Sequence, residues 1–196
     1  MAKIDNNICF IDFETTGSNL FEDDPIQIGA FLVDWSNSKE VEFESNIRPS
    51  KNAVNTQKAF QIHHIDIFEL KEEPTAKEVL SRFFKKIGTN YCFAGWNISF
   101  DVPFFRKICY ENNFQKEFNL INYRHIDVQS ICKTLNYLGI VEKNLNSLTD
   151  FSNHFGIPRS KKHRALEDAI ITYHVFCKAL QMLEGQSIEK RNLFFQ

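Results

Sequence analysis

The sequence predicts a domain of the α/β class, in which helices and strands share one core. Three strand-like segments come first, at residues 4–13, 25–35 and 41–47, and helical patterns then alternate with short apolar segments up to residue 183. The 196 residues suit a single domain, and 43% hydrophobic with 24% charged residues is typical of a folded globular protein.

The first three segments have the composition of β-strands. Residues 4–13 and 25–35 are apolar runs of the kind found in buried strands, whereas VEFESNI at residues 41–47 alternates apolar and polar side chains. We expect the three to be consecutive neighbours in one sheet.

The middle of the chain predicts a helix, a strand and a second helix. Thr75 with Glu78 three residues later has the spacing of a capping box, and Gly88 marks the end of that helix. A short buried strand is expected at residues 91–96. The next helix is expected over residues 99–111, with Ser99 as its N-cap and Pro103 in its first turn.

The last third of the chain predicts a strand around Ile126 and three helices at residues 128–138, 148–155 and 164–183. We expect one domain over residues 1–184 and a tail over residues 185–196. The tail contains the apolar trio Leu193-Phe194-Phe195. This trio either docks on a partner or belongs to a frayed end that packs on its own domain.

Composition and charge exclude several classes of protein. The start of the chain lacks the features of a signal peptide and no apolar run reaches the roughly 18 residues of a membrane span, which predicts a cytoplasmic protein without membrane contact. Five cysteines without a CxxC pair predict reduced, mostly buried thiols. A net charge of −2 argues against a protein that wraps duplex DNA but allows a grip on one strand end.

The segment FIDFETTG at residues 10–17 carries the clearest chemical signal. Asp12 and Glu14 are two residues apart on a predicted strand, so their side chains face the same way. Burying two like charges is costly, and no lysine or arginine lies nearby in sequence to compensate them. A divalent cation would supply the compensation. The alternative is that the strand ends at Phe13 and leaves Glu14 in solvent.

Two further carboxylates and a histidine lie at predicted helix starts. Asp101 falls in the first turn of a helix, and Asp168 lies beside the buried stripe marked by Leu166 and Ile170, so it can face inward. His163 precedes the last helix in a basic loop. Each has a simpler explanation when taken alone, because an aspartate stabilises a helix start and a lone histidine is more often structural than catalytic.

Together, four segments resemble the DEDDh branch of the DnaQ-like 3′-to-5′ exonuclease family, which includes DNA polymerase proofreading subunits, oligoribonuclease and RNase T. They are FIDFETTG at residues 10–17, NISFD at 97–101, SLTDFSNHFGIP at 147–158, and His163-x-Ala165-x-x-Asp168. The match extends over residues 4–183. It implies an RNase H-like fold with a mixed five-stranded sheet flanked by helices.

The resemblance implies catalysis by two Mg²⁺ or Mn²⁺ ions, which suit oxygen ligands. Carried over, Asp12, Glu14 and Asp168 hold the ion that activates water, Asp12 also holds the second ion, and Asp101 completes the acidic set directly or through water. His163, with an ordinary pKa of about 6.5, becomes the general base. The resemblance also assigns a substrate pocket to Thr15, Thr16, Gly17, Phe60, His63, Asn97 and Phe100.

The sequence departs from the family pattern at three places. Trp96 stands where a histidine is common, and Ser18 stands where a leucine or methionine wedges against the terminal base. Either Leu20 or Phe21 replaces that wedge, or base stacking is weaker. In FQIHHI at residues 60–65, a histidine stands at the position of the family's glycine.

The expected function is release of nucleotides from the 3′ end of single-stranded DNA, as in a proofreading subunit whose tail meets a polymerase or replication partner. The alternative is an exoribonuclease, because tolerance of a 2′-hydroxyl is not readable from the sequence. Residues 12–16 also resemble the strand motif of haloacid-dehalogenase phosphatases, but the later lysine and paired aspartates of that class are not evident. A non-catalytic binding protein is expected to have lost acidic ligands, and all five positions are filled.

Overall fold

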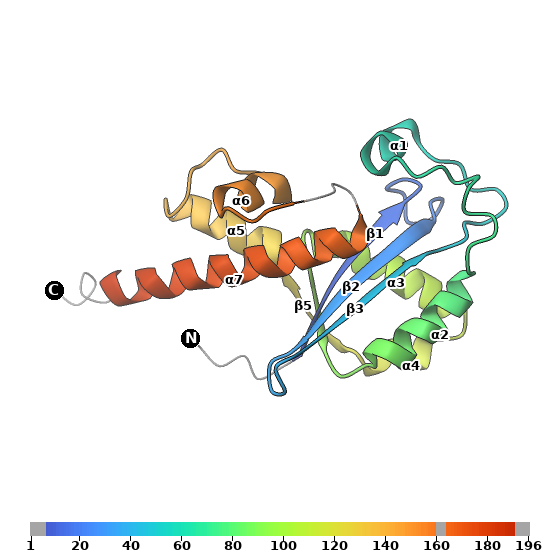
Figure 1. Cartoon of the computed structure of the whole chain (residues 1–196), viewed down its shortest axis with the longest axis horizontal. Coiled ribbons are helices and arrows are strands. Elements are labelled where there is room, and N and C mark those ends of the chain that lie inside the picture. Colours follow the sequence, from blue (N-terminus) through green and yellow to red (C-terminus); the bar gives the residue numbers. More distant parts are fainter. Residues whose placement is uncertain (1–6, 160–163, 191–196) are drawn as a thin grey trace.

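The computed structural model describes residues 7–159 and 164–190, with side chains described up to residue 185. Within these residues a five-stranded mixed sheet runs in the order β3-β2-β1-β4-β5 (Figure 1). Strands β1 to β3 are antiparallel neighbours, and β4 and β5 extend the sheet in parallel with β1. The predicted mixed five-stranded sheet is confirmed. The strands are β1 (Ile8–Thr15), β2 (Pro25–Asp34), β3 (Lys39–Asn46), β4 (Cys92–Gly95) and β5 (Asn122–Asp127).

Helices cover both faces of the sheet (Figure 1). Alternate residues of β1 enter two separate cores: Cys9, Ile11 and Phe13 pack on one side, and Ile8 and Phe10 on the other. The first core includes side chains of α2, α3 and α4, and the second those of α5, α6 and α7. The helices are α1 (Gln57–His63), α2 (Ala76–Ile87), α3 (Ile98–Glu111), α4 (Gln115–Leu120), α5 (Val128–Tyr137), α6 (Leu148–His154) and α7 (Ala165–Lys190).

The predicted helix starts are partly correct. The capping box of Thr75 and Glu78 is present at α2. The helix predicted over residues 99–111 is present as α3, but the predicted N-cap is wrong. The N-cap is Asn97 in the left-handed conformation, and Ser99 lies inside the helix and donates a hydrogen bond to Asn97 Oδ1 at 2.9 Å. Pro103 is therefore in the second turn, where it leaves the carbonyl of Ser99 without its helical partner.

Two short helices, α1 and α4, were not expected from the sequence. Helix α7 continues to Lys190, past residue 184, where we expected the domain to end. The boundary between domain and tail stays a prediction. The trio Leu193-Phe194-Phe195 lies outside the described residues. All five cysteines are free and four of them are buried, as expected. Among the described helices, none is long and apolar enough to cross a lipid bilayer.

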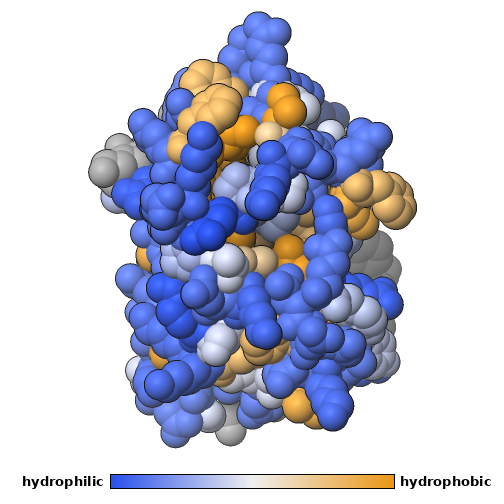
Figure 2. Space-filling model, turned by 90° about the vertical axis from the view of Figure 1, so that its right-hand side faces the viewer, coloured by the Kyte–Doolittle hydropathy of each residue, from blue (hydrophilic) through white to orange (hydrophobic). Residues whose placement is uncertain are grey.

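The face on the right of Figure 1 is mostly hydrophilic, with hydrophobic residues in small separate groups (Figure 2). Some of these groups lie near the top of Figure 2, at the height of α1 in Figure 1. Phe60 and Ile62 of α1 are both exposed. Scattered hydrophobic residues are common on the surfaces of folded proteins.

Candidate active site

Three carboxylates meet at the end of β1. Asp12, Glu14 and Asp168 each offer an oxygen atom within 4.8 Å of the others. Asp12 and Glu14 lie on the side of β1 that faces α7, because they continue the alternation of Ile8 and Phe10. Glu14 is part of the strand and is buried, which excludes the alternative that left it in solvent.

Helix α7 reaches these carboxylates because it lies directly on β2. Gly29 of β2 pairs with Asp12 of β1, and a Cβ atom at Gly29 would collide with the backbone nitrogen of Leu166. Glycine is required here for close approach of the helix backbone to the sheet. This contact places the first two turns of α7, with Asp168, over the end of β1.

A glutamine fixes the same helix end. Gln27 pairs with Glu14 across β1 and β2, and its Oε1 accepts a hydrogen bond from the backbone N–H of Ala165 at 3.0 Å. Its Nε2 donates to Asn46 Oδ1 at 2.9 Å, which holds the carboxamide in place. Gln27 therefore satisfies one of the free N–H groups at the start of α7.

Asp101 lies beside the three carboxylates but has a structural bond of its own. Its buried Oδ1 accepts a hydrogen bond from the backbone N–H of Phe13 at 3.0 Å. This bond ties the first turns of α3 to β1. The negative charge of Asp101 also raises the pKa of Asp12.

Burial and mutual repulsion make these carboxylates hard to ionise. Burial, followed by the charges of Asp101, Glu14 and Asp168, raises the pKa of Asp12 well above its ordinary value. Burial and then Asp168 raise the pKa of Glu14 from 4.5 to about 8. A group of this kind is stabilised by a cation, and a donor set made only of carboxylate oxygens fits Mg²⁺ or Mn²⁺ rather than a soft metal.

Arg159 is a cation in the cluster that sequence reasoning missed. Its buried guanidinium donates a hydrogen bond to Asp168 Oδ1 and another to Thr149 Oγ1, the latter at 2.7 Å. Its positive charge lowers the pKa of Asp12 and of Glu14. The only sequence signal for it was the uncompensated charge of Asp12 and Glu14, which indicates a cation but not where in the chain it lies.

A cavity of about 290 Å³ opens beside Glu14. It is lined by four of the residues assigned to the substrate pocket, namely Thr15, Gly17, His63 and Phe100. Ser18, at the position of the expected wedge, also lines it. Nδ1 of His63 accepts a hydrogen bond from the backbone N–H of Ile65 at 2.9 Å, which fixes the ring at the cavity wall.

The other three residues assigned to the pocket lie outside its lining. Thr16 donates a hydrogen bond to Asp23 Oδ1 at 3.2 Å and thus holds the loop after β1. Asn97 is exposed and accepts the bond from Ser99, and Phe60 is exposed and packs edge-on against His64 at a centroid distance of 6.3 Å.

The loop after β1 directs its apolar side chains away from this cavity. Asp23 fills the space beside Gly17, where a Cβ atom would collide with its carboxylate, and it accepts a hydrogen bond from the N–H of Asn19 at 2.7 Å. Leu20 and Phe21 line a different, larger cavity beside α3. Neither residue therefore replaces the wedge at Ser18.

Two positions where the family has a histidine are His163 and Trp96. His163, the expected general base, falls in residues 160–163 and lies outside the described residues. Trp96, which stands where the family often has histidine, packs on Phe151 at a centroid distance of 5.7 Å. Its ring belongs to the core on the α6 side of the sheet.

Comparison with known proteins agrees with this arrangement. Residues 9–176 match the family model RNase_T, described as exonuclease. The chain is 28% identical over 182 residues to the DNA polymerase III subunit epsilon of Aquifex aeolicus, covering 92% of this chain and 83% of the relative. It is 27% identical over 189 residues to the PolC-type DNA polymerase III of Caldanaerobacter subterraneus, covering 96% of this chain but only 12% of that protein.

A solved structure shares the fold. The zinc-bound complex of E. coli exonuclease I with single-stranded DNA superposes with a TM-score of 0.75 at 20% identity, covering 98% of this chain and 43% of that chain. The chain thus spans less than half of that nuclease and about an eighth of the PolC-type polymerases.

Proposed function

This chain belongs to the exonuclease family that it matches over residues 9–176, and we propose that it releases nucleotides one at a time from the 3′ end of single-stranded DNA. The observation that carries the proposal is the convergence of Asp12, Glu14 and Asp168 oxygens within 4.8 Å, directly beside a cavity. The names of the relatives, a polymerase III epsilon subunit and an exonuclease I complex with single-stranded DNA, favour DNA as the substrate.

The carboxylates would hold two Mg²⁺ or Mn²⁺ ions. Asp12, Glu14 and Asp168, whose oxygens lie within 4.8 Å of one another, would hold these ions, and Asp101 would complete the set directly or through water. When bound, such ions lower the pKa of water and stabilise charge on the attacking and leaving oxygens of a phosphodiester. His163 would accept the proton of the attacking water.

The cavity of about 290 Å³ would take the terminal nucleotide. Phe100 offers an aromatic ring to the base, and the backbone around Thr15 and Gly17 offers polar atoms to the sugar and phosphate. Because Ser18 has no apolar side chain, we expect weaker stacking of the terminal base than a leucine or methionine would provide.

Digestion of matched single-stranded DNA and RNA tests this function. Each strand carries a label at one end, and products are separated over time in Mg²⁺ and in Mn²⁺. The proposal predicts mononucleotides from the 3′ end of DNA, slower digestion of RNA and of duplex, and no cleavage when the 3′ end is blocked. Efficient cleavage of a circular single strand, or faster digestion of RNA, would contradict it.

A replication partner in the cytoplasm completes the proposal. The epsilon relative is a polymerase III subunit by name, and the tail trio Leu193-Phe194-Phe195 is the segment we assign to a polymerase contact. Purified replicative polymerase from the same cell should bind the full chain more tightly than a chain ending at residue 190. Equal binding of the two chains would remove the tail from this role.

A further inference from the structure

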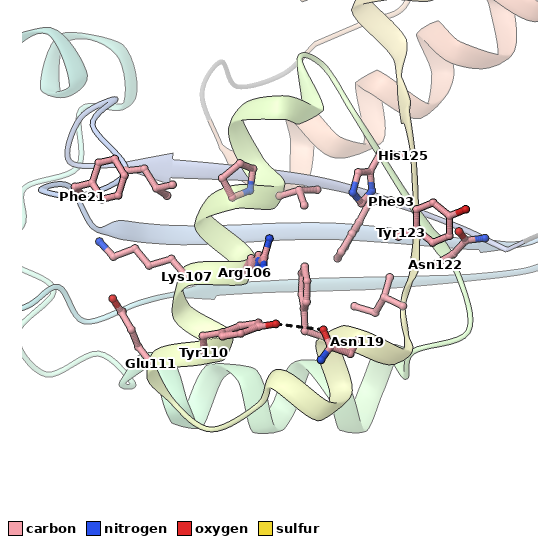
Figure 3. A pocket seen from close by; sticks show the side chains of 15 residues that line it. Phe21, Phe93, Arg106, Lys107, Tyr110, Glu111, Asn119, Asn122, Tyr123 and His125 are labelled. Carbon is pink, nitrogen blue, oxygen red and sulfur yellow. Dashed lines mark hydrogen bonds between the residues drawn. The ribbon is translucent and has the colours of Figure 1, made fainter.

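A second and larger cavity lies outside the acidic cluster. It has a volume of about 750 Å³ and lies between α3, α4 and β5. Figure 3 shows Arg106, Lys107 and Tyr110 reaching it from α3, with Tyr123 on the opposite wall. We call this cavity the groove. None of the acidic residues proposed to hold metal lines it, so the proposed chemistry gives it no role.

Two tyrosine rings in the groove are each covered by a guanidinium. Arg106 lies over Tyr110 at 5.2 Å, and Arg124 lies over Tyr123 at 4.8 Å. The rings remain accessible, since Tyr110 is 42% and Tyr123 is 75% exposed. The hydroxyl of Tyr110 donates to Asn119 Oδ1 at 3.3 Å, which orients the ring (Figure 3). Accessible aromatic rings beside arginine are the elements of a stacking platform for nucleic-acid bases.

The charges of the groove favour an anionic ligand. In residues 7–159 and 164–190, the ion pairs involve Lys107, Arg159 and Arg164, and neither Arg106 nor Arg124 is in an ion pair with a carboxylate. Lys107 lies 3.8 Å from Asp24, which offsets part of its charge. Among the described residues that line the groove, Glu111 is the one acidic residue, whereas Arg106 and Lys107 are both basic. Positive charges therefore exceed negative charges around the two rings.

Helix α3 connects the acidic cluster to the groove. Val102 and Pro103, the residues after Asp101, line the groove, and Tyr110 lines it further along the same helix. The rise of an α-helix puts Tyr110 roughly 13 Å beyond Asp101 along the helix axis. That distance corresponds to about four nucleotides at the spacing of roughly 3.4 Å in a stacked strand. Phe21, which is 91% exposed, also lines the groove rather than the terminal-nucleotide cavity.

We propose that this groove binds the part of a single strand that lies on the 5′ side of the scissile phosphate. Bases stack on Tyr110 and Tyr123, and backbone phosphates lie near Arg106 and Arg124. The inference rests on the proposed function, because it places the strand end at the acidic cluster. It also explains how a chain with serine at the wedge position still holds its substrate: stacking moves from the terminal base to upstream bases.

Direct binding of oligothymidylate of about 12 nucleotides tests the groove. Fluorescence anisotropy compares Tyr110→Ala/Tyr123→Ala with the unmodified groove, both carrying Asp12→Asn to prevent degradation. The double variant should raise the dissociation constant tenfold or more, on the order of the binding free energy that one or two stacked bases contribute. Arg106→Gln should reduce the slope of log Kd against log salt by about 0.7, the value for one phosphate contact on a single strand.

A small substrate separates the groove from the catalytic cavity. The p-nitrophenyl ester of thymidine 5′-monophosphate is too short to reach Tyr110, so Tyr110→Ala/Tyr123→Ala with Asp12 intact should hydrolyse it at the normal kcat and KM. Tyr137→Ala is the matched control, because Tyr137 is 86% exposed on α5 and outside the groove. It should bind the oligonucleotide normally.

Each outcome decides between the two proposals. Normal affinity of the double variant for the oligonucleotide would overturn the groove, as would an equal loss with Tyr137→Ala or an equal loss on the small ester. If the chain with both tyrosines and Asp12 intact hydrolyses neither substrate, while the double variant still weakens oligonucleotide binding, the groove is sustained and the exonuclease is refuted. Tyr110→Phe/Tyr123→Phe should retain affinity, since the ring rather than the hydroxyl is the stacking surface, and failure of this rescue would also contradict the groove.

Discussion

Arg159 donates a hydrogen bond from its buried guanidinium to Asp168, and the same guanidinium donates to Thr149. It therefore carries a positive charge into a cluster whose other members are carboxylates. A buried cluster of carboxylates destabilises the folded state unless positive charge compensates it. The chain supplies part of it through Arg159, and the proposed metal ions would supply the rest.

Replacement of Arg159 should therefore destabilise the metal-free protein more than the metal-loaded one. Arg159→Gln breaks a buried pair, for which the expected loss is about 3 kcal/mol in EDTA, with a smaller loss in Mg²⁺ or Mn²⁺. Urea unfolding in both conditions measures the difference. Arg164→Gln is the control, because its pair with Glu44 at 3.2 Å is partly exposed and should contribute at most about 1 kcal/mol. Equal losses for Arg159→Gln with and without metal would contradict this role.

Gly29→Ala should displace α7 and open the carboxylate cluster. The added Cβ atom meets the backbone of Leu166, so the expected cost is about 1–3 kcal/mol together with weaker Mn²⁺ binding. Thermal unfolding and the electron paramagnetic resonance of free Mn²⁺ measure the two effects. Gly185→Ala, on the same helix but with open space around its Cβ, should instead leave Mn²⁺ binding unchanged and stabilise by up to about 1 kcal/mol. Normal Mn²⁺ affinity in Gly29→Ala would show that the glycine does not position Asp168.

The metal-free protein should lose stability as the pH rises. The pKa of Glu14 is raised by burial from 4.5 in the unfolded chain to about 8 in the folded one. The folded state thus holds this proton more strongly, and its contribution to stability is complete below about pH 4.5 and is lost as the pH rises towards 8. Unfolding in EDTA across this window should show the decline, and Glu14→Gln should flatten it. A stability that climbs over the same window in EDTA would refute the assigned pKa direction.

His163→Ala should lower kcat by about 10²-fold or more while leaving substrate binding nearly unchanged, as expected for loss of a general base. The rate of the unmodified enzyme should rise with pH through the histidine pKa, and that limb should flatten or move in the variant. Measurements at saturating metal isolate the histidine from the ligands. An identical acidic limb in both proteins, or a loss confined to KM, would make His163 a bystander.

Features set by nearby residues could be predicted from the sequence. Strand alternation put Asp12 and Glu14 on one face, and the spacing of Thr75 and Glu78 identified the start of α2. The resemblance of four segments gave the mixed five-stranded sheet and the family. These are short-range patterns or motifs that keep their meaning wherever the chain folds.

Features set by contacts between distant segments could not be predicted. In the sequence, Gly29 and Gln27 look like ordinary strand residues. Their role depends on the packing of the start of α7 against β2. Arg159 lies far from Asp12 in sequence and reaches the cluster only in the folded chain. The start of α3 was misplaced because Ser99 is a common N-cap, whereas Asn97 adopts the left-handed conformation one residue before the helix.

Hydrolysis of a labelled single strand by Asp12→Asn and Asp168→Asn in Mg²⁺ tests whether the carboxylate cluster carries the reaction. Both variants should fold. Asp12→Asn should be as stable as the unmodified chain or more stable in EDTA, because it relieves carboxylate repulsion. Asp168→Asn also breaks the buried pair with Arg159 and should lose stability. Glu42→Gln, which changes an exposed carboxylate on β3, is the control and should retain full activity. The two aspartate variants should lose nearly all 3′-end hydrolysis, because each removes a proposed metal ligand. Near-normal rates in both folded variants would contradict it.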